Sequence, residues 1–127
     1  GKTLFAAKES QCVKCHGPEG RGDGEEQVDI YDDWNKPKKG VTPEQTEKLA
    51  RLFSLPLRRL RPRNFREGVF RGGDRPEDLY LRIHVGIKGT PMPGVGPMPG
   101  SAGVLTPEQI WHVVDYVLSL GPGARKP

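Results

Sequence analysis

Apolar residues recur at helical spacing in four stretches of the chain, separated by polar segments rich in glycine and proline. A periodicity of three to four residues predicts amphipathic helices. The predicted helices cover residues 2–11, about 43–54, 76–86 and 107–120. No stretch alternates between apolar and polar residues as a β-strand does, so the pattern predicts an all-α fold with long loops.

Two of the predicted helices begin with the residues that favour a helix N-terminus. Threonine, proline, glutamate and glutamine follow one another at 42–45 and again at 106–109. The threonine hydroxyl can accept a hydrogen bond from a free backbone N–H, and proline suits the first helical position. The glutamine can complete a capping box. These helices are therefore expected to begin at Pro43 and Pro107.

The composition leaves little material for a hydrophobic core. The 127 residues include 17 glycines and 13 prolines, and only 34% are hydrophobic. This length fits a single domain. A buried apolar cofactor would add apolar area to a thin core, and it would give long ordered loops a surface to pack against.

Charge is unevenly distributed, although the formal net charge is only +4. Residues 56–75 hold seven arginines against two acids, whereas residues 19–33 hold seven acids against one arginine. Such a dipolar surface can steer a charged partner, although most charge runs are solvated surface. Nucleic-acid binding is not indicated, because aromatic residues make up only 7% and no binding motif accompanies the arginines. The sequence shows neither a transmembrane segment nor a signal peptide.

The clearest chemical signal is a pair of cysteines followed by a histidine, Cys12-Val13-Lys14-Cys15-His16. The C-x-x-C-H pattern is typical of a covalent haem site. Two thiols at this spacing can add to the two vinyl groups of a porphyrin, and the adjacent histidine can bind the iron through a ring nitrogen. We therefore expect one haem c, attached at Cys12 and Cys15, with His16 as an iron ligand.

Three other uses of the cysteine pair are less favoured: a disulfide, half of a zinc site and a thioredoxin-type dithiol. A structural zinc usually needs four cysteine or histidine ligands, and the remaining histidines, His84 and His112, stand alone in the sequence. A thioredoxin-type dithiol needs a βαβ context, which the pattern lacks.

Around this motif the chain resembles the class I cytochromes c, including their bacterial monohaem members. The resemblance covers residues 1–17 and about 57–120. It rests on Gly1-x-x-Leu4-Phe5, Leu60-Arg61-Pro62-Arg63-Asn64-Phe65, Gly86-Ile87-Lys88-Gly89-Thr90-Pro91-Met92-Pro93, and Val113 to Leu120 with Tyr116. It implies one cytochrome c domain over residues 1–127, in which the N- and C-terminal helices cross over the covalently bound haem. Tyr116 would then lie near Gly1 and Phe5, and residues 18–56, with the extra helix, would be an insertion.

The second iron ligand is expected to be a methionine. Met92 and Met98 each stand between two prolines, and such a stiff loop can present a sulfur at a low cost in ordering. The resemblance favours Met92, which follows Gly89-Thr90 as in the distal loop of the family. A thioether ligand favours ferrous iron and raises the reduction potential. Met98 is expected to fill a gap in an irregular core.

The resemblance also suggests residues that support the haem. In bacterial members, the carbonyl of the proline that corresponds to Pro62 orients the haem histidine. Arg61 and Arg63 flank this proline, and they are candidates to pair with the two haem propionates, whose negative charges need compensation.

The remaining histidines and tryptophans are expected to have other roles. His84 should be hydrogen-bonded or exposed, and His112 should be exposed, since a lone histidine is seldom a ligand. Trp111 is expected to pack against other side chains. Trp34 lies in the insertion, where its indole N–H is a further candidate for a propionate.

These features predict an electron carrier that is not itself an enzyme. One haem, with His16 and Met92 as axial ligands, would pass single electrons between a protein donor and a protein acceptor. One alternative is an open-site haem enzyme or gas sensor, if Met92 does not bind the iron. Another is the electron-entry domain of a larger oxidoreductase. Because haem of this kind is attached beyond the cytoplasmic membrane in bacteria, the resemblance implies a periplasmic or otherwise extracytoplasmic protein.

Overall fold

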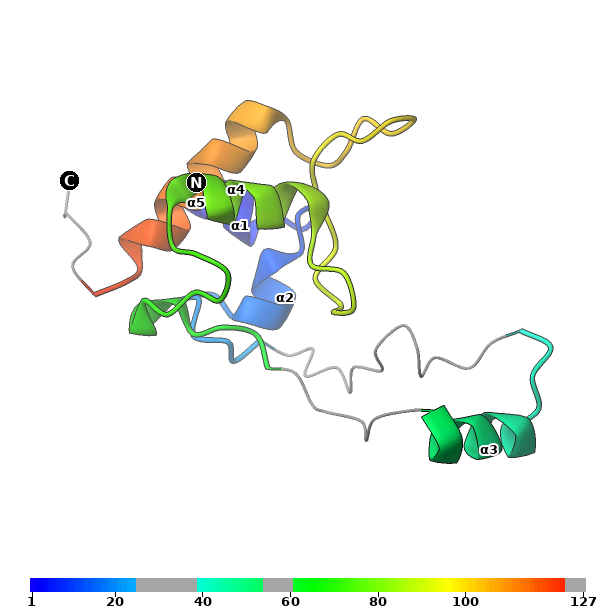
Figure 1. The fold of residues 1–127 in the computed structure, drawn as a ribbon. Coiled ribbons are helices and arrows are strands. Elements are labelled where there is room, and N and C mark those ends of the chain that lie inside the picture. The colour runs from blue at the N-terminus through cyan, green and yellow to red at the C-terminus, as the bar shows by residue number, and fades with distance from the viewer. Residues whose placement is uncertain (25–38, 54–60, 123–127) are drawn as a thin grey trace.

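The computed structural model describes residues 1–24, 39–53 and 61–122. These residues form five α-helices and one short 3-10 helix, which are joined by long loops; none of the described segments is a β-strand (Figure 1). The elements are α1 (Lys2–Ala6), α2 (Cys12–His16), α3 (Pro43–Phe53), η1 (Phe65–Glu67), α4 (Pro76–Val85) and α5 (Pro107–Ser119). The predicted all-α fold is confirmed. None of the described helices combines the length and the apolar character needed to cross a membrane.

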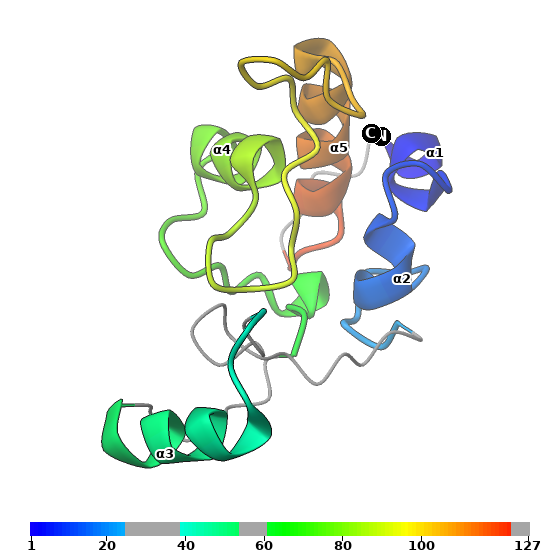
Figure 2. The same ribbon diagram turned by 90° about the vertical axis from the view of Figure 1, so that its right-hand side faces the viewer.

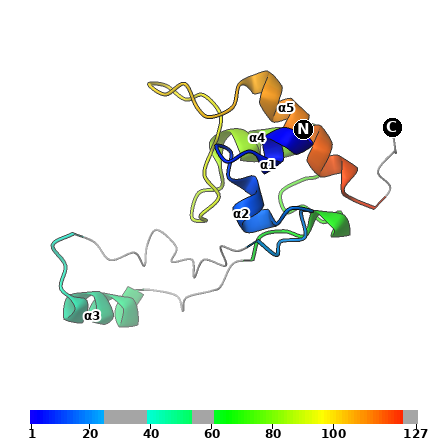
Figure 3. The ribbon, with the colours of Figure 1, turned by 180° about the vertical axis from the view of Figure 1, so that it is seen from behind.

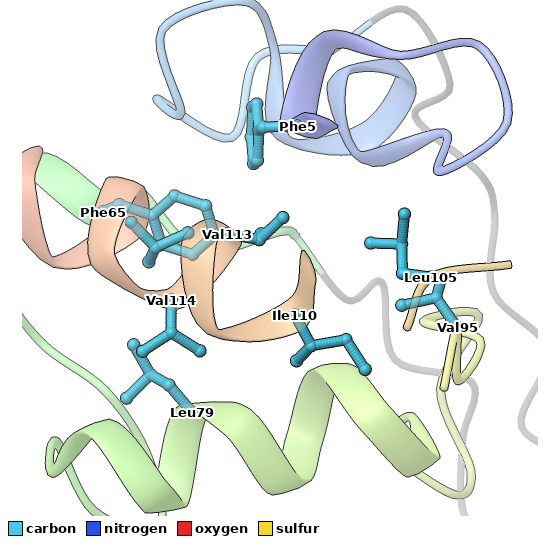
Figure 4. Packing of buried hydrophobic residues seen from close by; sticks show 9 residues of the cluster. Phe5, Phe65, Leu79, Val95, Leu105, Ile110, Val113 and Val114 are labelled. Atoms are coloured by element: carbon cyan, nitrogen blue, oxygen red, sulfur yellow. The ribbon is translucent and has the colours of Figure 1, made fainter. Parts of the chain in front are cut away.

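The last helix, α5, lies at the centre of the packed helices. The helix α4 packs on one side of α5, and α1 packs on another (Figure 2). Figure 4 shows Val114 of α5 directed toward Leu79 of α4, while Val113 points toward Phe5 of α1. The buried stripe of α5 consists of Ile110, Val113, Val114 and Val117. This stripe follows the helical period that predicted it.

The crossing of α1 and α5 brings the start of the described chain against the last helix. The rings of Phe5 and Tyr116 lie with their centroids 5.3 Å apart. A Cβ atom at Gly1 would collide with the carbonyl of His112 and with Cβ of Tyr116, so only glycine permits this approach. The predicted crossing of the terminal helices is confirmed.

The first helix is shorter than predicted: it was expected to cover residues 2–11, but α1 ends at Ala6 and a second helix, α2, begins at Cys12. The hydroxyl of Ser10 donates hydrogen bonds to the carbonyls of Leu4 (2.6 Å) and Ala7 (3.0 Å). A serine that binds carbonyls at the end of a helix competes with continuation of that helix. Gln11 then has a φ of 56°, in the left-handed region. This turn redirects the chain into α2.

Both predicted capping boxes are present. The Thr106 hydroxyl accepts a hydrogen bond from the Gln109 N–H (3.2 Å), and the Gln109 amide oxygen accepts one from the Thr106 N–H (2.9 Å). Thr42 and Gln45 make the same two bonds at the start of α3, at 3.2 and 3.0 Å. The helix α3 is drawn apart from the other helices in Figures 1 and 3, and its side chains do not belong to the core cluster of the described residues.

Truncation of a core residue of α5 should destabilise the protein far more than truncation of a surface residue of α4. Ile110 is fully buried, whereas Leu81 is 59% exposed. We expect Ile110→Ala to lower the free energy of unfolding by about 2–5 kcal/mol, since it removes buried methyl groups and leaves a cavity. Leu81→Ala should change it by less than about 0.5 kcal/mol. Denaturant unfolding measures both values, and equal losses would contradict this assignment of the core.

Candidate functional site

The cysteine and histidine motif forms a helix of its own, because α2 consists of residues Cys12–His16. The chain then turns back over the end of α2. The N–H of Gly22 donates to the carbonyl of His16 (2.9 Å), and the N–H of Gly24 donates to that of Cys15 (3.1 Å). These bonds satisfy carbonyls that the end of a short helix leaves open. The glycine-rich segment after the motif therefore fixes the orientation of α2.

The two cysteines are thiols that are not joined to each other by a disulfide. Both are half-buried, and the Cys12 thiol donates to the carbonyl of Ser10 at 3.6 Å. Burial raises the pKa of Cys12 above its ordinary value. The reactive cysteine of a redox dithiol has a lowered pKa instead. No three histidine, cysteine, aspartate or glutamate side chains converge within residues 1–24, 39–53 and 61–122.

His16 is held in a geometry suited to a metal ligand. Its Nδ1 atom lies 3.5 Å from the carbonyl oxygen of Arg63. Because a carbonyl only accepts hydrogen bonds, this contact favours the tautomer with the proton on Nδ1, which leaves the lone pair on Nε2 for a metal. Burial lowers the pKa of His16 below its ordinary value. The imidazole is therefore neutral at pH 7, as a metal ligand must be.

The carbonyl beside His16 differs from the predicted one. The carbonyl of Pro62 was expected at this position, but the structure places the carbonyl of the next residue, Arg63, there. The carbonyl of Pro62 instead lies against Gly22, where a Cβ atom would collide with it. Gly22 also has a φ of 75°, so its lack of a side chain allows the two loops to meet.

An aromatic cluster covers the imidazole of His16. The ring of Phe65 stacks on that of His16 with centroids 4.5 Å apart and an interplanar angle of 25°. Phe5 meets Phe65 edge-on at 6.3 Å, and Phe70 stacks on Phe65 at 6.0 Å. Phe65 stands within a family-like stretch of the sequence and was not among the predicted site residues. The signal in the sequence was an aromatic residue two positions after Arg63.

An ion-pair network joins the loop after α2 to the segment that carries Phe65. The carboxylate of Glu19 accepts hydrogen bonds from the guanidinium groups of Arg21 (2.9 Å) and Arg66 (3.1 Å). The N–H of Phe65 also donates to the carbonyl of Gly20 at 2.8 Å. The two segments are therefore joined both by backbone and by side-chain contacts.

Met92 lies in a closed loop that leads away from α4. Residues Gly86 and Pro93 form an isolated β-bridge, and the N–H of Ile87 donates to the carbonyl of Met92 at 3.1 Å. The N–H of Met92 donates to the Thr90 hydroxyl at 3.2 Å. The side chain of Met92 is half-buried. In Figure 2 this loop and α2 lie on opposite sides of the molecule, below the level of α4.

Met98 does not fill a gap in the core, so that expectation is wrong. It lies in a tight turn in which Met98 and Ser101 exchange backbone hydrogen bonds of 3.0 and 2.8 Å. This hairpin projects away from the packed helices in Figure 1, and the side chain of Met98 is 50% exposed. The proline and glycine between the two hydrogen-bonded residues suit such a turn, and the turn carries the methionine outward.

The other candidate residues lie as expected, where the structure describes them. His84 is hydrogen-bonded: its ring nitrogens lie 3.2 Å from the hydroxyl oxygen of Tyr80 and 2.9 Å from the carbonyl oxygen of Pro97. His112 is exposed. Trp111 packs on Tyr80, with ring centroids 4.5 Å apart.

The two arginines predicted to face the propionates both lie in the part of the chain that the structure describes. Arg61 is exposed and Arg63 is half-buried, and their role with a propionate stays a prediction. Trp34, the further candidate for a propionate, lies outside the described residues.

The donor set fits a covalently bound haem. The motif offers two thiols three positions apart, a neutral imidazole with Nε2 left for a metal, and apolar cover over that imidazole. A half-buried thioether is presented by a separate loop. The comparison with known families agrees, because the family description "Cytochrome c" matches residues 1–121. The chain belongs to the cytochrome c family. As a member of this family, the chain is a haem-based electron-transfer domain that binds haem c covalently.

A solved structure also resembles this cytochrome. It is the reducing HAO-like protein complex of Kuenenia stuttgartiensis, one chain of which is 30% identical, with a TM-score of 0.66. The match covers 95% of the present chain and 42% of that chain. The cytochrome described here therefore spans less than half the length of that relative. The search of curated proteins found no match.

The Glu19 carboxylate should titrate below the ordinary range of a glutamate. Its pKa is lowered first by the hydrogen bond from Arg21 and then by the charge of Arg66. A carboxylate with a lowered pKa keeps its ion pairs above its ordinary pKa and loses them as the pH falls through the lowered value. We expect Arg21→Ala to raise this pKa toward the ordinary value, and Arg66→Ala to raise it by less.

NMR titration of the Glu19 side-chain carboxyl measures these changes. Arg75→Ala is the matched control, because Arg75 pairs with Asp78 and not with Glu19. A shift of the Glu19 titration in Arg75→Ala as large as that in Arg21→Ala would contradict the assignment of the network.

Proposed function

We propose that this cytochrome is a monohaem electron carrier, with haem c attached at Cys12 and Cys15 and with His16 and Met92 as the axial ligands. The orientation of His16 carries the proposal. Its Nδ1 atom faces the Arg63 carbonyl, so Nε2 is the ring nitrogen left for the iron. When bound, the haem supplies an iron that exchanges single electrons between the ferric and ferrous states.

The chain's own residues have three tasks in this function. The two thiols fix the cofactor covalently, and α2 places His16 directly after the second thiol. The Arg63 carbonyl faces Nδ1, and the Phe65 ring stacks on the imidazole and covers it with apolar surface. A ligand held in this way moves little when the charge on the iron changes, which keeps reorganisation small.

Met92 is the better of the two methionines for the second position. Its side chain is half-buried in a loop closed by Thr90 and Ile87. Met98, in contrast, is half exposed at an outward hairpin. A preorganised loop lowers the cost of holding a thioether in place.

We also propose that the segment after the insertion supports the cofactor. Arg61 and Arg63 are its candidates to pair with the propionates through charge-assisted hydrogen bonds. Pro62 would contribute through the close approach of its carbonyl to Gly22. Residues 1–127 would form one cytochrome c domain in which 18–56 is an insertion.

The setting of this carrier is an extracytoplasmic redox system with protein partners. The chain is similar to part of a chain in a reducing HAO-like protein complex, and it covers 42% of that chain. A cytochrome domain of this kind can serve as the electron-entry domain of a larger oxidoreductase as well as a separate carrier. In both settings it exchanges electrons with a donor and an acceptor and transforms no substrate itself.

Substitution of the two methionines tests the ligand assignment. The oxidised protein should show the charge-transfer absorption band of methionine-bound ferric haem. We expect Met92→Ala to abolish this band and to lower the reduction potential, since it removes the soft ligand. Met98→Ala is the matched control and should leave both unchanged. Absorption spectroscopy and potentiometry provide the measurements.

Two results would contradict the assignment. One is a band that survives Met92→Ala and disappears in Met98→Ala. The other is rapid binding of carbon monoxide to the reduced native protein, which would show an open iron site and favour a haem enzyme or gas sensor.

A further inference from the structure

The parallel stack of Phe65 on His16 is tighter than the other ring contacts of this cluster. The two centroids are 4.5 Å apart, and the rings are inclined by only 25°. Phe5 approaches the same imidazole at 6.4 Å and at an angle of 48°. Phe65 therefore lies flat against one face of the imidazole, whereas Phe5 meets it obliquely.

Phe65 is itself fixed on several sides. Its side chain is buried in the core, and Phe5 and Phe70 contact its ring. Its N–H donates to the carbonyl of Gly20, and a Cβ atom at Gly20 would press on the Phe65 ring. A residue with so many contacts cannot easily change rotamer. The surface that it offers to His16 is therefore rigid.

Two contacts act on the imidazole in different ways. The Arg63 carbonyl fixes where Nδ1 points, but a single hydrogen bond of 3.5 Å leaves rotation of the ring about that direction weakly restrained. A parallel ring on the imidazole face restrains this rotation, because turning the imidazole would drive its edge into Phe65. The hydrogen bond and the stack together define the imidazole plane.

We propose that Phe65 is the positioning residue that sets the plane of the His16 imidazole relative to the haem. This inference rests on the proposed function, since it requires His16 to be the iron ligand. The plane of an axial imidazole determines how the unpaired electron of ferric low-spin iron is distributed over the porphyrin. Phe65 thus controls an electronic property of the site without touching the iron.

Proton NMR of the oxidised holoprotein tests this role, because the hyperfine-shifted haem methyl signals report the imidazole plane. Phe65→Leu and Phe65→Met remove the ring, and methionine keeps a flexible apolar side chain of similar length. We expect both variants to change the spread of the four haem methyl shifts. Phe65→Tyr keeps the ring and should therefore show the same methyl pattern as the native protein. The use of Met and Tyr keeps the test valid if Phe65→Leu does not fold.

Phe70→Leu is the matched control. Within the described residues Phe70 has a ring contact with Phe65 and none with His16. Its substitution loosens the same cluster but leaves the imidazole stack in place, so the native methyl pattern should persist. An unchanged pattern in Phe65→Met would overturn the proposal. So would a change of equal size in Phe70→Leu, because general loosening of the core would then explain both.

A separate measurement distinguishes failure of this inference from failure of the proposed function. Haem that stays on the denatured native chain shows that the covalent site exists. If the haem is retained and the methyl pattern does not respond to Phe65→Met, only the positioning role is wrong. If the native chain carries no covalent haem, both proposals are wrong.

Discussion

A neutral histidine held inside a small protein needs a hydrogen-bond acceptor for one ring nitrogen and apolar cover for its faces. In this cytochrome the acceptor is the carbonyl of Arg63 and the cover is the ring of Phe65. Both belong to a segment far along the chain from His16. The packing of Phe65 against Phe5 joins that segment to α1, and α1 in turn crosses α5. The helix crossing and the orientation of His16 therefore depend on one set of contacts.

The local features of this structure were predictable from the sequence. The caps at Thr42 and Thr106 are set by neighbouring residues, and so is the helical stripe of α5. The C-x-x-C-H motif is local as well, because its chemistry needs only five adjacent residues. The crossing of the terminal helices followed from the resemblance to the cytochromes c, and Phe5 and Tyr116 meet as that resemblance implied.

The features that the sequence analysis missed depend on contacts between distant segments or on a hydroxyl group. Helical periodicity continued α1 to residue 11, but the bonds from Ser10 to two carbonyls end it earlier. Whether the carbonyl of Pro62 or that of Arg63 accepts the hydrogen bond from His16 depends on how two loops meet. The two Pro-Met-Pro segments look alike in sequence. They differ in structure because Thr90 closes one loop, while a tight turn carries Met98 outward.

If Cys12 and Cys15 hold one haem covalently, with His16 placed beside it, the haem must stay on the unfolded chain. The intact mass of the purified, denatured protein measures this. We expect a mass equal to that of the polypeptide, 14.1 kDa for these residues, plus one haem. Substitution of both cysteines by alanine should return the mass to that of the polypeptide alone. A native protein whose mass after denaturation includes no haem would show that Cys12 and Cys15 do not hold the cofactor.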